Sequence, residues 1–203
     1  MNPNRLLFPR LTQYLDGLPQ QLESYPSAVT RSDFSMILRR QLAPFLTEEN
    51  LPHSLRSILT APWKEGDWIP TTAYVALCAI ARDQLWQSEQ EYHRGMFDVA
   101  TEMYKGPVYR MLFFMFGPSI VAMNAAKRWD TLHQGTKLVI KKQKKESINL
   151  TLTFPQNLFS EAAVQSLGAA FCAIAQGPGG KDPAFTLLSF SDSEAEVLIS
   201  WTY

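Results

Sequence analysis

The residues of this chain best suited to acid–base, nucleophilic or metal chemistry are its histidines and cysteines. The 203 residues include three histidines, His53, His93 and His133, and two cysteines, Cys78 and Cys172. A histidine base needs a nucleophile on a sharp turn nearby, but the sequence contains no GxSxG turn. Structural zinc needs four clustered ligands, and the sequence has no CxxC and no HxxxH spacing. We therefore predict a non-enzymatic chain with no catalytic residue, metal or cofactor.

The surroundings of these residues predict structural roles for them. Each cysteine is flanked by alanines and by aliphatic or aromatic residues, which is typical of a small buried side chain in a reducing compartment. The histidines are expected at the surface or at helix ends. His133 follows a predicted helix, and a cationic imidazole is stabilised near a helix C-terminus.

Two further segments contain residues that bind anions in other proteins. The run GPGGK at 177–181 follows a predicted helix and precedes a predicted strand, whereas a phosphate-binding loop leads from a strand into a helix. We interpret it as a connecting loop. One predicted hairpin carries the lysines Lys137, Lys141, Lys142, Lys144 and Lys145. They are typical of a solvated sheet edge, and an anionic docking site is the alternative.

Large, soft side chains are densest between Tyr104 and Trp129. Methionine and aromatic residues build apolar cores, but they also line ligand cavities, where a neighbouring cation can orient an anionic group. We predict a ligand or partner site where the segment 109–129 meets the hairpin 136–154. Its residues are Tyr109, Arg110, Phe113, Met123, Arg128, Trp129 and Lys141. The alternatives are a dry core here and a site at the loop 61–69.

Composition and charge exclude several classes of protein. Hydrophobic residues make up 46% of the chain, enough for a substantial core, and 19 basic residues balance 19 acidic ones. This balance argues against a nucleic-acid or anionic-membrane partner. The most apolar stretch, 111–123, is interrupted by Gly117-Pro118 and is shorter than the roughly 20 residues that span a bilayer. Because the N-terminus also lacks a signal-peptide pattern, we predict a cytoplasmic protein without a transmembrane segment.

The first two-thirds of the chain is predicted to be helical. Residues 1–31 contain four prolines and are expected to form an irregular arm that packs on the domain or exchanges within a homodimer. The helical layer covers 32–134, with helices beginning near Ser32, Pro70 and Ser88. Ser88 and Glu91 have the spacing of a capping box, so the start of the third helix is the best defined.

From residue 135 the pattern changes to hairpin, helix and hairpin. In the run 148–154 apolar and polar residues alternate, as in a strand with one buried face. The predicted elements are strands 136–142, 148–154, 185–190 and 197–203 and a helix 157–176. Val197, Ile199 and Trp201 are expected to face the core. The resulting fold is a single α+β domain, 1–203, with a mostly antiparallel four-stranded sheet covered by the preceding helices.

The segment from Tyr104 to Tyr203 resembles a bacterial family without an assigned function, whose members have a similar length and are best represented in myxobacteria. The shared features are an aromatic-rich helix, 109–116, that ends in Gly117-Pro118, an aromatic residue near the end of the next helix (Trp129), and a final strand that ends in tryptophan (Trp201). The resemblance implies a non-catalytic binding or signalling module.

More distantly, the order helices, hairpin, helix, hairpin resembles the ligand-binding fold of haem-based nitric-oxide sensors, 4-vinyl-reductase-type domains and small vesicle-tethering subunits. The haem-binding branch combines a proximal histidine with a Tyr-x-Ser-x-Arg segment. Here the nearest match is Tyr25-Pro26-Ser27-Ala28-Val29, in which valine replaces arginine, so no haem is expected. The predicted function is a binding module of a bacterial signalling or regulatory system, for a small apolar ligand or a protein partner. The alternative is a structural homodimer or adaptor.

Overall fold

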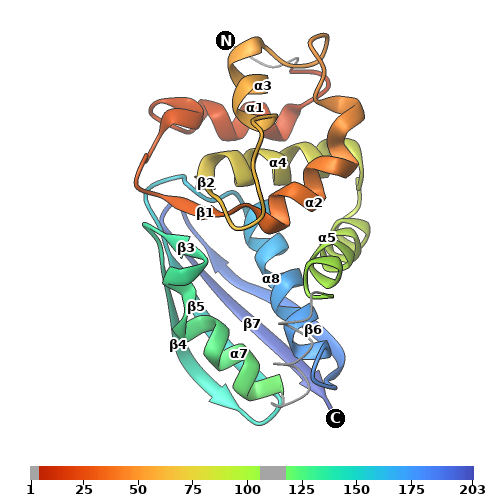
Figure 1. Cartoon of the computed structure of the whole chain (residues 1–203). Coiled ribbons are helices and arrows are strands. Elements are labelled where there is room, and N and C mark those ends of the chain that lie inside the picture. Colours follow the sequence, from red (N-terminus) through yellow and green to blue (C-terminus); the bar gives the residue numbers. More distant parts are fainter. Residues whose placement is uncertain (1–4, 106–117) are drawn as a thin grey trace.

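The computed structural model describes residues 5–105 and 118–203, so the predicted site residues Tyr109, Arg110 and Phe113 lie outside the described residues. Helices fill one end of the molecule and a sheet the other (Figure 1). The described α-helices are α1 (Pro9–Asp16), α2 (Ser32–Leu42), α3 (His53–Leu59), α4 (Thr71–Gln84), α5 (Glu89–Met103), α7 (Pro118–Lys127) and α8 (Glu161–Gln176). Among them, none is long and apolar enough to cross a membrane.

The larger sheet confirms the predicted α+β class. Its strands are β4 (Lys137–Lys144), β5 (Ser147–Thr153), β6 (Lys181–Phe190) and β7 (Glu194–Thr202), all antiparallel and in the order β4-β5-β7-β6. Leu150 pairs with Val197 across the two central strands, and both side chains are buried. Trp201 is 3% exposed, so the last strand faces the core as predicted. Alternation in the sequence was sufficient here because each central strand has one buried face.

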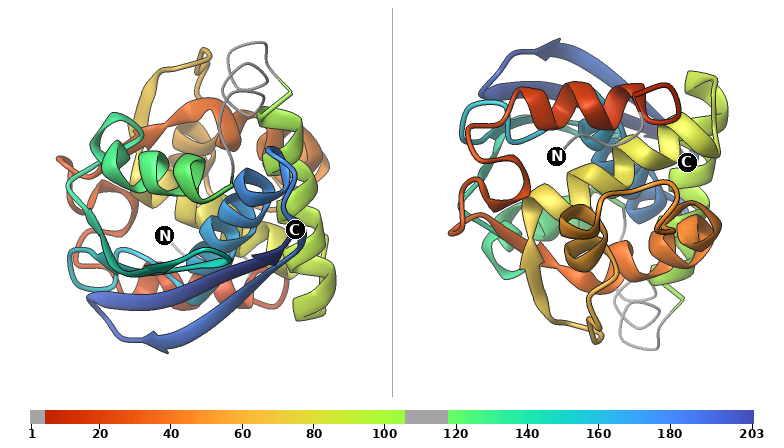
Figure 2. Two further views of the ribbon diagram at one scale, coloured as in Figure 1. Left: turned by 90° about the horizontal axis from the view of Figure 1, so that it is seen from below. Right: turned by 90° about the horizontal axis from the view of Figure 1, so that it is seen from above.

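The cover of this sheet differs in part from the prediction, because α8 shares it with α7 of the predicted helical layer. Helices α7 and α8 contact the sheet, whereas α4 and α5 pack on α8. Viewed from below, α7 and α8 lie on the same side of the strands (Figure 2). The reason is the composition of α8, which buries residues on both of its sides, from Ala163 and Val164 to Phe171 and Cys172. A helix that is apolar all round belongs in the middle of a domain rather than on its outside.

A second, small sheet joins the two ends of the molecule. Its strands are β1 (Val29–Arg31), β2 (Trp68–Pro70) and β3 (His133–Gln134), in the order β2-β1-β3. The sequence did not predict it, because two or three residues are too few to show a period. Gly135 follows β3 with φ of 74°, and a Cβ there would lie 2.8 Å from the Cα of Ala28. The link between the small and the large sheet therefore requires glycine.

The N-terminal segment, described from residue 5, packs on the domain, which is one of the two predicted roles, but it is more regular than the predicted arm. It contains α1, a 3-10 turn at Gln21–Glu23, and strand β1. Pro9 occupies the first turn of α1, where proline is tolerated, and Leu11, Tyr14 and Leu15 are buried. Helix α1 contacts α4, so this segment belongs to the core. The prolines were interpreted as breaks in the chain, but one of them begins a helix.

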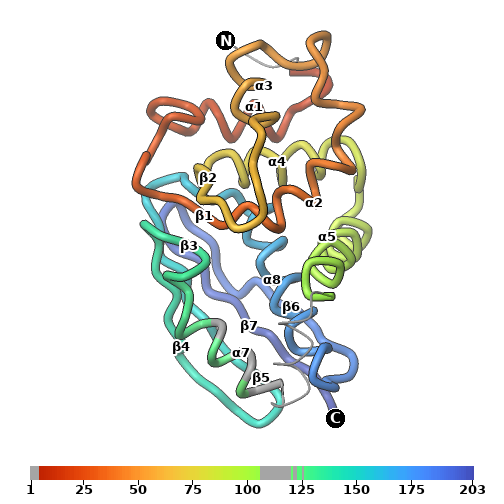
Figure 3. The backbone as a smooth tube through the Cα atoms, viewed as in Figure 1, coloured from red at the N-terminus to blue at the C-terminus, as the bar shows by residue number. Residues whose placement is uncertain are grey.

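Side-chain caps position the helices of the core. Ser88 Oγ accepts a hydrogen bond from the Glu91 amide (3.2 Å), and the Glu91 carboxylate accepts one from the Ser88 amide (3.1 Å), which confirms the predicted capping box. Ser32 lies inside α2 rather than capping it, and its hydroxyl donates to Lys64 O (2.6 Å). Figure 3 follows the chain from the red helices at one end of the molecule to the blue strands at the other.

Candidate functional site

The described members of the predicted site lie on α7, the turn after it and β4. Met123 is half-buried on α7, Arg128 and Lys141 are exposed, and Trp129 is buried. The Trp129 indole Nε1 donates a hydrogen bond to Thr136 Oγ1 (2.9 Å). Helix α7 and the turn after it both contact β4, so these residues share one region of the fold. Their role in binding stays a prediction.

His133 has a different environment from the one predicted. Its ring stacks on Trp129, with centroids 3.9 Å apart and planes at 15°, and its Nδ1 lies 2.9 Å from Thr30 Oγ1. Burial lowers the pKa of His133 to about 3, so the imidazole is neutral rather than the helix-end cation that was expected. Threonine beside histidine has the geometry of a nucleophile and its base, but Thr30 is 3% exposed and so low a pKa makes a poor base.

The other two histidines are separate from His133 and from each other. His53 is exposed at the start of α3, as predicted. His93 is half-buried on α5, its ring lies 6.1 Å from the ring of Phe185, and its buried Nε2 has no hydrogen-bond partner among the described residues. Burial lowers the pKa of His93. His93 and His133 are half-buried, because side chains from other elements pack on their rings, and the local sequence gives no sign of these contacts.

The contact between α4, α5 and α8, here called the junction, is closed by bonded side chains. The Tyr74 hydroxyl lies 3.1 Å from Ser166 Oγ, and the Tyr92 hydroxyl donates to Ala162 O (2.9 Å). Cys78 is fully buried between these rings, and burial raises the pKa of its thiol to about 12. The prediction that both cysteines are buried hydrophobes is confirmed.

A cleft of about 600 Å³ lies beside the junction, and we call it the α8 cleft. Helices α1 and α4, the first turn of α8 and the β6–β7 turn line it. Arg10 and Arg82 contribute positive charges, and Glu89, Glu161 and Asp192 contribute negative ones. Of the predicted site, the four described residues, Met123, Arg128, Trp129 and Lys141, are not among those that line this cleft. One signal in the sequence pointed to it: Arg82 ends an apolar run on α4, and a charged residue on a fully buried helix is unusual.

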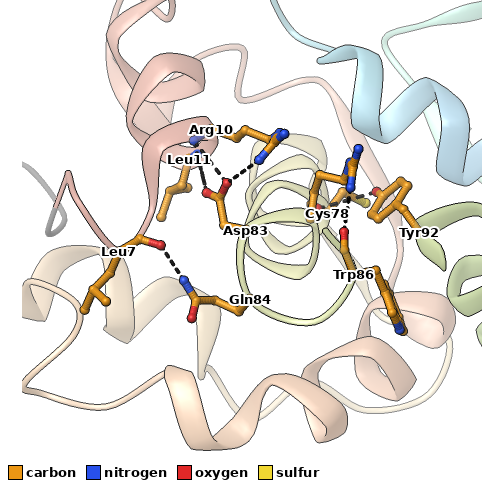
Figure 4. A network of polar contacts seen from close by, with 9 residues as sticks. Leu7, Arg10, Leu11, Cys78, Asp83, Gln84, Trp86 and Tyr92 are labelled. Carbon is orange, nitrogen blue, oxygen red and sulfur yellow. Dashed lines mark hydrogen bonds and ion pairs between the residues drawn. The ribbon is translucent and has the colours of Figure 1, made fainter. Parts of the chain in front are cut away.

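The wall between α1 and α4 is held by a polar network (Figure 4). The Asp83 carboxylate accepts hydrogen bonds from the Arg10 amide (3.0 Å), the Leu11 amide (3.3 Å) and Arg10 Nη1 (3.1 Å). Burial raises the pKa of Asp83, and these three donors oppose the rise. The Gln84 amide also donates to Leu7 O. Asp83 therefore caps the N-terminus of α1 from the neighbouring helix α4. Its carboxylate also forms an ion pair with Arg10.

Comparisons with known proteins identify the fold. The Fe(II) unliganded H-NOX protein from K. algicida superposes with a TM-score of 0.54 and 7% sequence identity, over 85% of this chain and 97% of that one. A Cs H-NOX mutant gives a TM-score of 0.53 and 10% identity, over 85% and 97%. This chain shares the H-NOX fold. The distant resemblance to haem-based nitric-oxide sensors is thus confirmed at the level of fold.

No protein-family model and no curated protein matches the sequence. The resemblance to the myxobacterial family therefore has no support beyond the features that suggested it.

The histidines and cysteines do not fit a haem, the group that this fold carries in the sensors. All five of them lie among the described residues. Burial raises the pKa of both thiols to about 12, and ligation requires the thiolate. Trp129 covers the ring of His133, His93 packs on Phe185 outside the α8 cleft, and His53 is exposed. None of these side chains offers a ring nitrogen or thiolate to a cavity large enough for a porphyrin.

The side chains of the segment that replaces the Tyr-x-Ser-x-Arg pattern also form contacts within the protein. The Tyr25 hydroxyl donates to Gln156 O (2.7 Å), and Val29 begins strand β1. The nearest arginine, Arg31, donates from Nε to Thr131 O (3.3 Å), and its guanidinium lies 4.1 Å from the ring of Trp68. Tyr25 and Arg31 are thus held by contacts within the protein, and Arg31 braces the small sheet through Trp68.

Proposed function

We propose that this chain is a non-catalytic, cytoplasmic binding module of a bacterial signalling or regulatory system, and that it binds a small molecule in the α8 cleft. The observation that carries the proposal is Arg82, a buried arginine that forms no salt bridge among the described residues, in the wall of a cleft of ligand size. Pockets for small ligands are typically about 300–1,000 Å³ and present a few placed polar groups. The H-NOX fold supports a sensor role by analogy only.

The proposal changes the expected chemistry of the ligand. The sequence suggested an apolar guest, but the α8 cleft presents charged and amide side chains together with Tyr14, Phe159 and Phe190. A ligand with both a charged and an apolar part matches this lining better than a purely apolar one. Buried, unpaired cysteine thiols on α4 and α8 support a reducing compartment such as the cytoplasm.

Native mass spectrometry of freshly purified full-length protein tests this function. We expect a monomer that carries a small molecule, which denaturation releases, and an absorption spectrum without a Soret band. A Soret band would overturn the haem-free part of the proposal. A monomer that carries nothing and gains no stability from any compound of a metabolite library would overturn the binding function.

A homodimer or adaptor is the second candidate, and one feature favours it. Strand β6 forms an edge of the larger sheet and exposes Leu188 (48%) and Phe190 (39%). Unpaired edge strands of this kind can pair with a second chain. A ligand-free dimer in the same native mass spectrum, broken by Leu188→Lys, would support this alternative over the first.

A further inference from the structure

Arg82 is a buried cation that forms no salt bridge among the described residues, and the Glu91 carboxylate interacts with it only at longer range. It is 8% exposed, its Nη1 donates to Trp86 O (2.6 Å), and its guanidinium lies 5.6 Å from the ring of Tyr92. The adjacent carboxylate, Asp83, pairs with Arg10 instead. A buried charge without a partner costs free energy, so Arg82 has unused capacity to bind an anion from the cleft that it lines.

The first turn of α8 faces the same cleft and supplies further donors. Ser160 caps the Ala163 amide (3.3 Å) and its carbonyl accepts from Val164. The amides of Glu161 and Ala162 come before these two, and the described residues bring no acceptor to either. A helix of 16 residues also carries partial positive charge at this end.

Tyr92 links the arginine to the helix. The ring that the Arg82 guanidinium approaches belongs to the tyrosine whose hydroxyl donates to Ala162 O (2.9 Å). Arg82 and the first turn of α8 are therefore held on either side of one rigid side chain. Two independent anion-binding features converge on a single wall of the cleft.

The other charges of the cleft limit the ligand to one negative charge. Glu161 accepts from Gln165 (3.3 Å) and Asp192 accepts from Gln156 (3.0 Å), but neither has an arginine or lysine partner among the described ion pairs. Glu89 adds a third carboxylate to the lining. These groups repel a phosphate dianion or a dicarboxylate more strongly than a monocarboxylate.

We propose that the α8 cleft binds a small monocarboxylate, with its carboxylate between Arg82 and the first turn of α8 and its apolar body against Phe159 and Phe190. This assignment rests on the proposed function and specifies its ligand class. Phe159 is buried and Phe190 is 39% exposed, so they form an inner and an outer apolar surface in the lining. A carboxylate accepts two parallel hydrogen bonds from a guanidinium, which favours it over a neutral oxygen.

Titration of the full-length, ¹⁵N-labelled protein with benzoate tests the assignment. We expect shifts at the Glu161 and Ala162 amides with benzoate, and at least about tenfold weaker binding of benzyl alcohol, phthalate and inorganic phosphate, which is about 1.4 kcal/mol. Arg82→Gln should weaken benzoate binding about 10- to 100-fold, as expected for hydrogen bonds to a charged group. Glu161→Gln, at an exposed position, should strengthen it about two- to fivefold because one repulsive charge is removed.

Arg40→Gln is the matched control, since Arg40 forms an exposed pair with Glu102 (2.9 Å) away from the cleft. It should leave the dissociation constant of benzoate unchanged. Equal binding of benzoate and benzyl alcohol, or tighter binding of phosphate, would overturn the monocarboxylate assignment and leave the binding function standing. Weaker benzoate binding by Glu161→Gln would also overturn it, and that variant does not depend on the stability of the Arg82 variant. A protein that binds no compound of any class would overturn the proposed function itself.

Discussion

The junction and the α8 cleft share the first turn of α8 but satisfy their polar groups in opposite ways. In the junction, Tyr92 donates to Ala162 O, and Tyr74 and Ser166 bond each other, so a buried contact is closed by its own side chains. The α8 cleft is lined by Arg82 of α4 and by the first turn of α8, where the described residues bring no acceptor to the Glu161 and Ala162 amides. A buried polar group that finds its partner inside the chain stabilises the fold, and one that does not is available to a ligand.

The largest expected effect is on the junction. Tyr74→Ala removes a fully packed ring from the contact of α4 with α8 and should lower the free energy of unfolding by about 3–5 kcal/mol. Tyr74→Phe keeps the ring and should cost about 1–3 kcal/mol, because Ser166 loses its bonded partner. Urea denaturation followed by circular dichroism measures both. Equal costs for the two variants would mean that the hydroxyl, not the ring, closes the junction.

A second test concerns the acid stability of the region around His133. Burial lowers the pKa of His133 to about 3, so the folded state excludes a proton that the unfolded chain binds below about 6.5. This part of the stability is present above pH 6.5 and is lost as the pH falls from 6.5 toward 3, by at most about 1.4 kcal/mol per pH unit. His133→Phe keeps a flat ring against Trp129 and should remove this part of the slope.

Denaturation midpoints from pH 3.5 to 7.5 measure the effect. If wild type and His133→Phe lose stability in parallel as the pH falls, then the buried, neutral state of His133 would be wrong.

A third test adds a methyl group to the tightly packed contact between α8 and β6. A Cβ at Gly168 would lie 2.1 Å from the nearest ring carbon of Phe185, so one of them must move. We expect Gly168→Ala to cost about 1–3 kcal/mol of unfolding free energy, as overpacked cores do. The double variant Gly168→Ala with Phe185→Leu should recover part of that loss. A Gly168→Ala protein as stable as wild type would show that the contact between α8 and β6 has room for an additional methyl group.

The smallest expected effect is at the exposed residues of the first predicted site. Arg128→Gln and Lys141→Gln should each change the free energy of unfolding by less than about 0.5 kcal/mol, because both side chains are exposed. If the α8 cleft is the binding site, neither variant changes benzoate affinity. A loss of affinity in these variants, with Arg82→Gln unaffected, would move the site to α7 and β4.

Local patterns predicted the parts of the fold that depend on local chemistry. The alternation in β5 and β7 and the Ser88–Glu91 cap both act within a few residues, and both were predicted correctly. The small sheet, the burial of His133 and the position of α8 depend on partners that are distant in the sequence, such as Thr30 with His133. Single-sequence patterns contain no information on such pairs.

Sequence patterns were also insufficient to locate the candidate site. Arg82 was visible as a charge at the end of an apolar helix, but its value as a binding residue comes from what is missing beside it. Asp83, its neighbour in sequence, would be the obvious partner, and only the structure shows that Arg10 takes that carboxylate. The predicted site used the density of aromatic residues instead, a signal that packing and binding produce equally.

The two edges of the larger sheet determine how the protein behaves in concentrated solution. The β4 edge carries exposed lysines, whereas β6 has no charged residue from Pro183 to Phe190. With a formal net charge of zero at pH 7, whole-molecule repulsion does little to keep copies apart. Precipitation on concentration should therefore begin by strand pairing at β6, and a single lysine there, as in Leu188→Lys, should raise the solubility limit without touching the cleft.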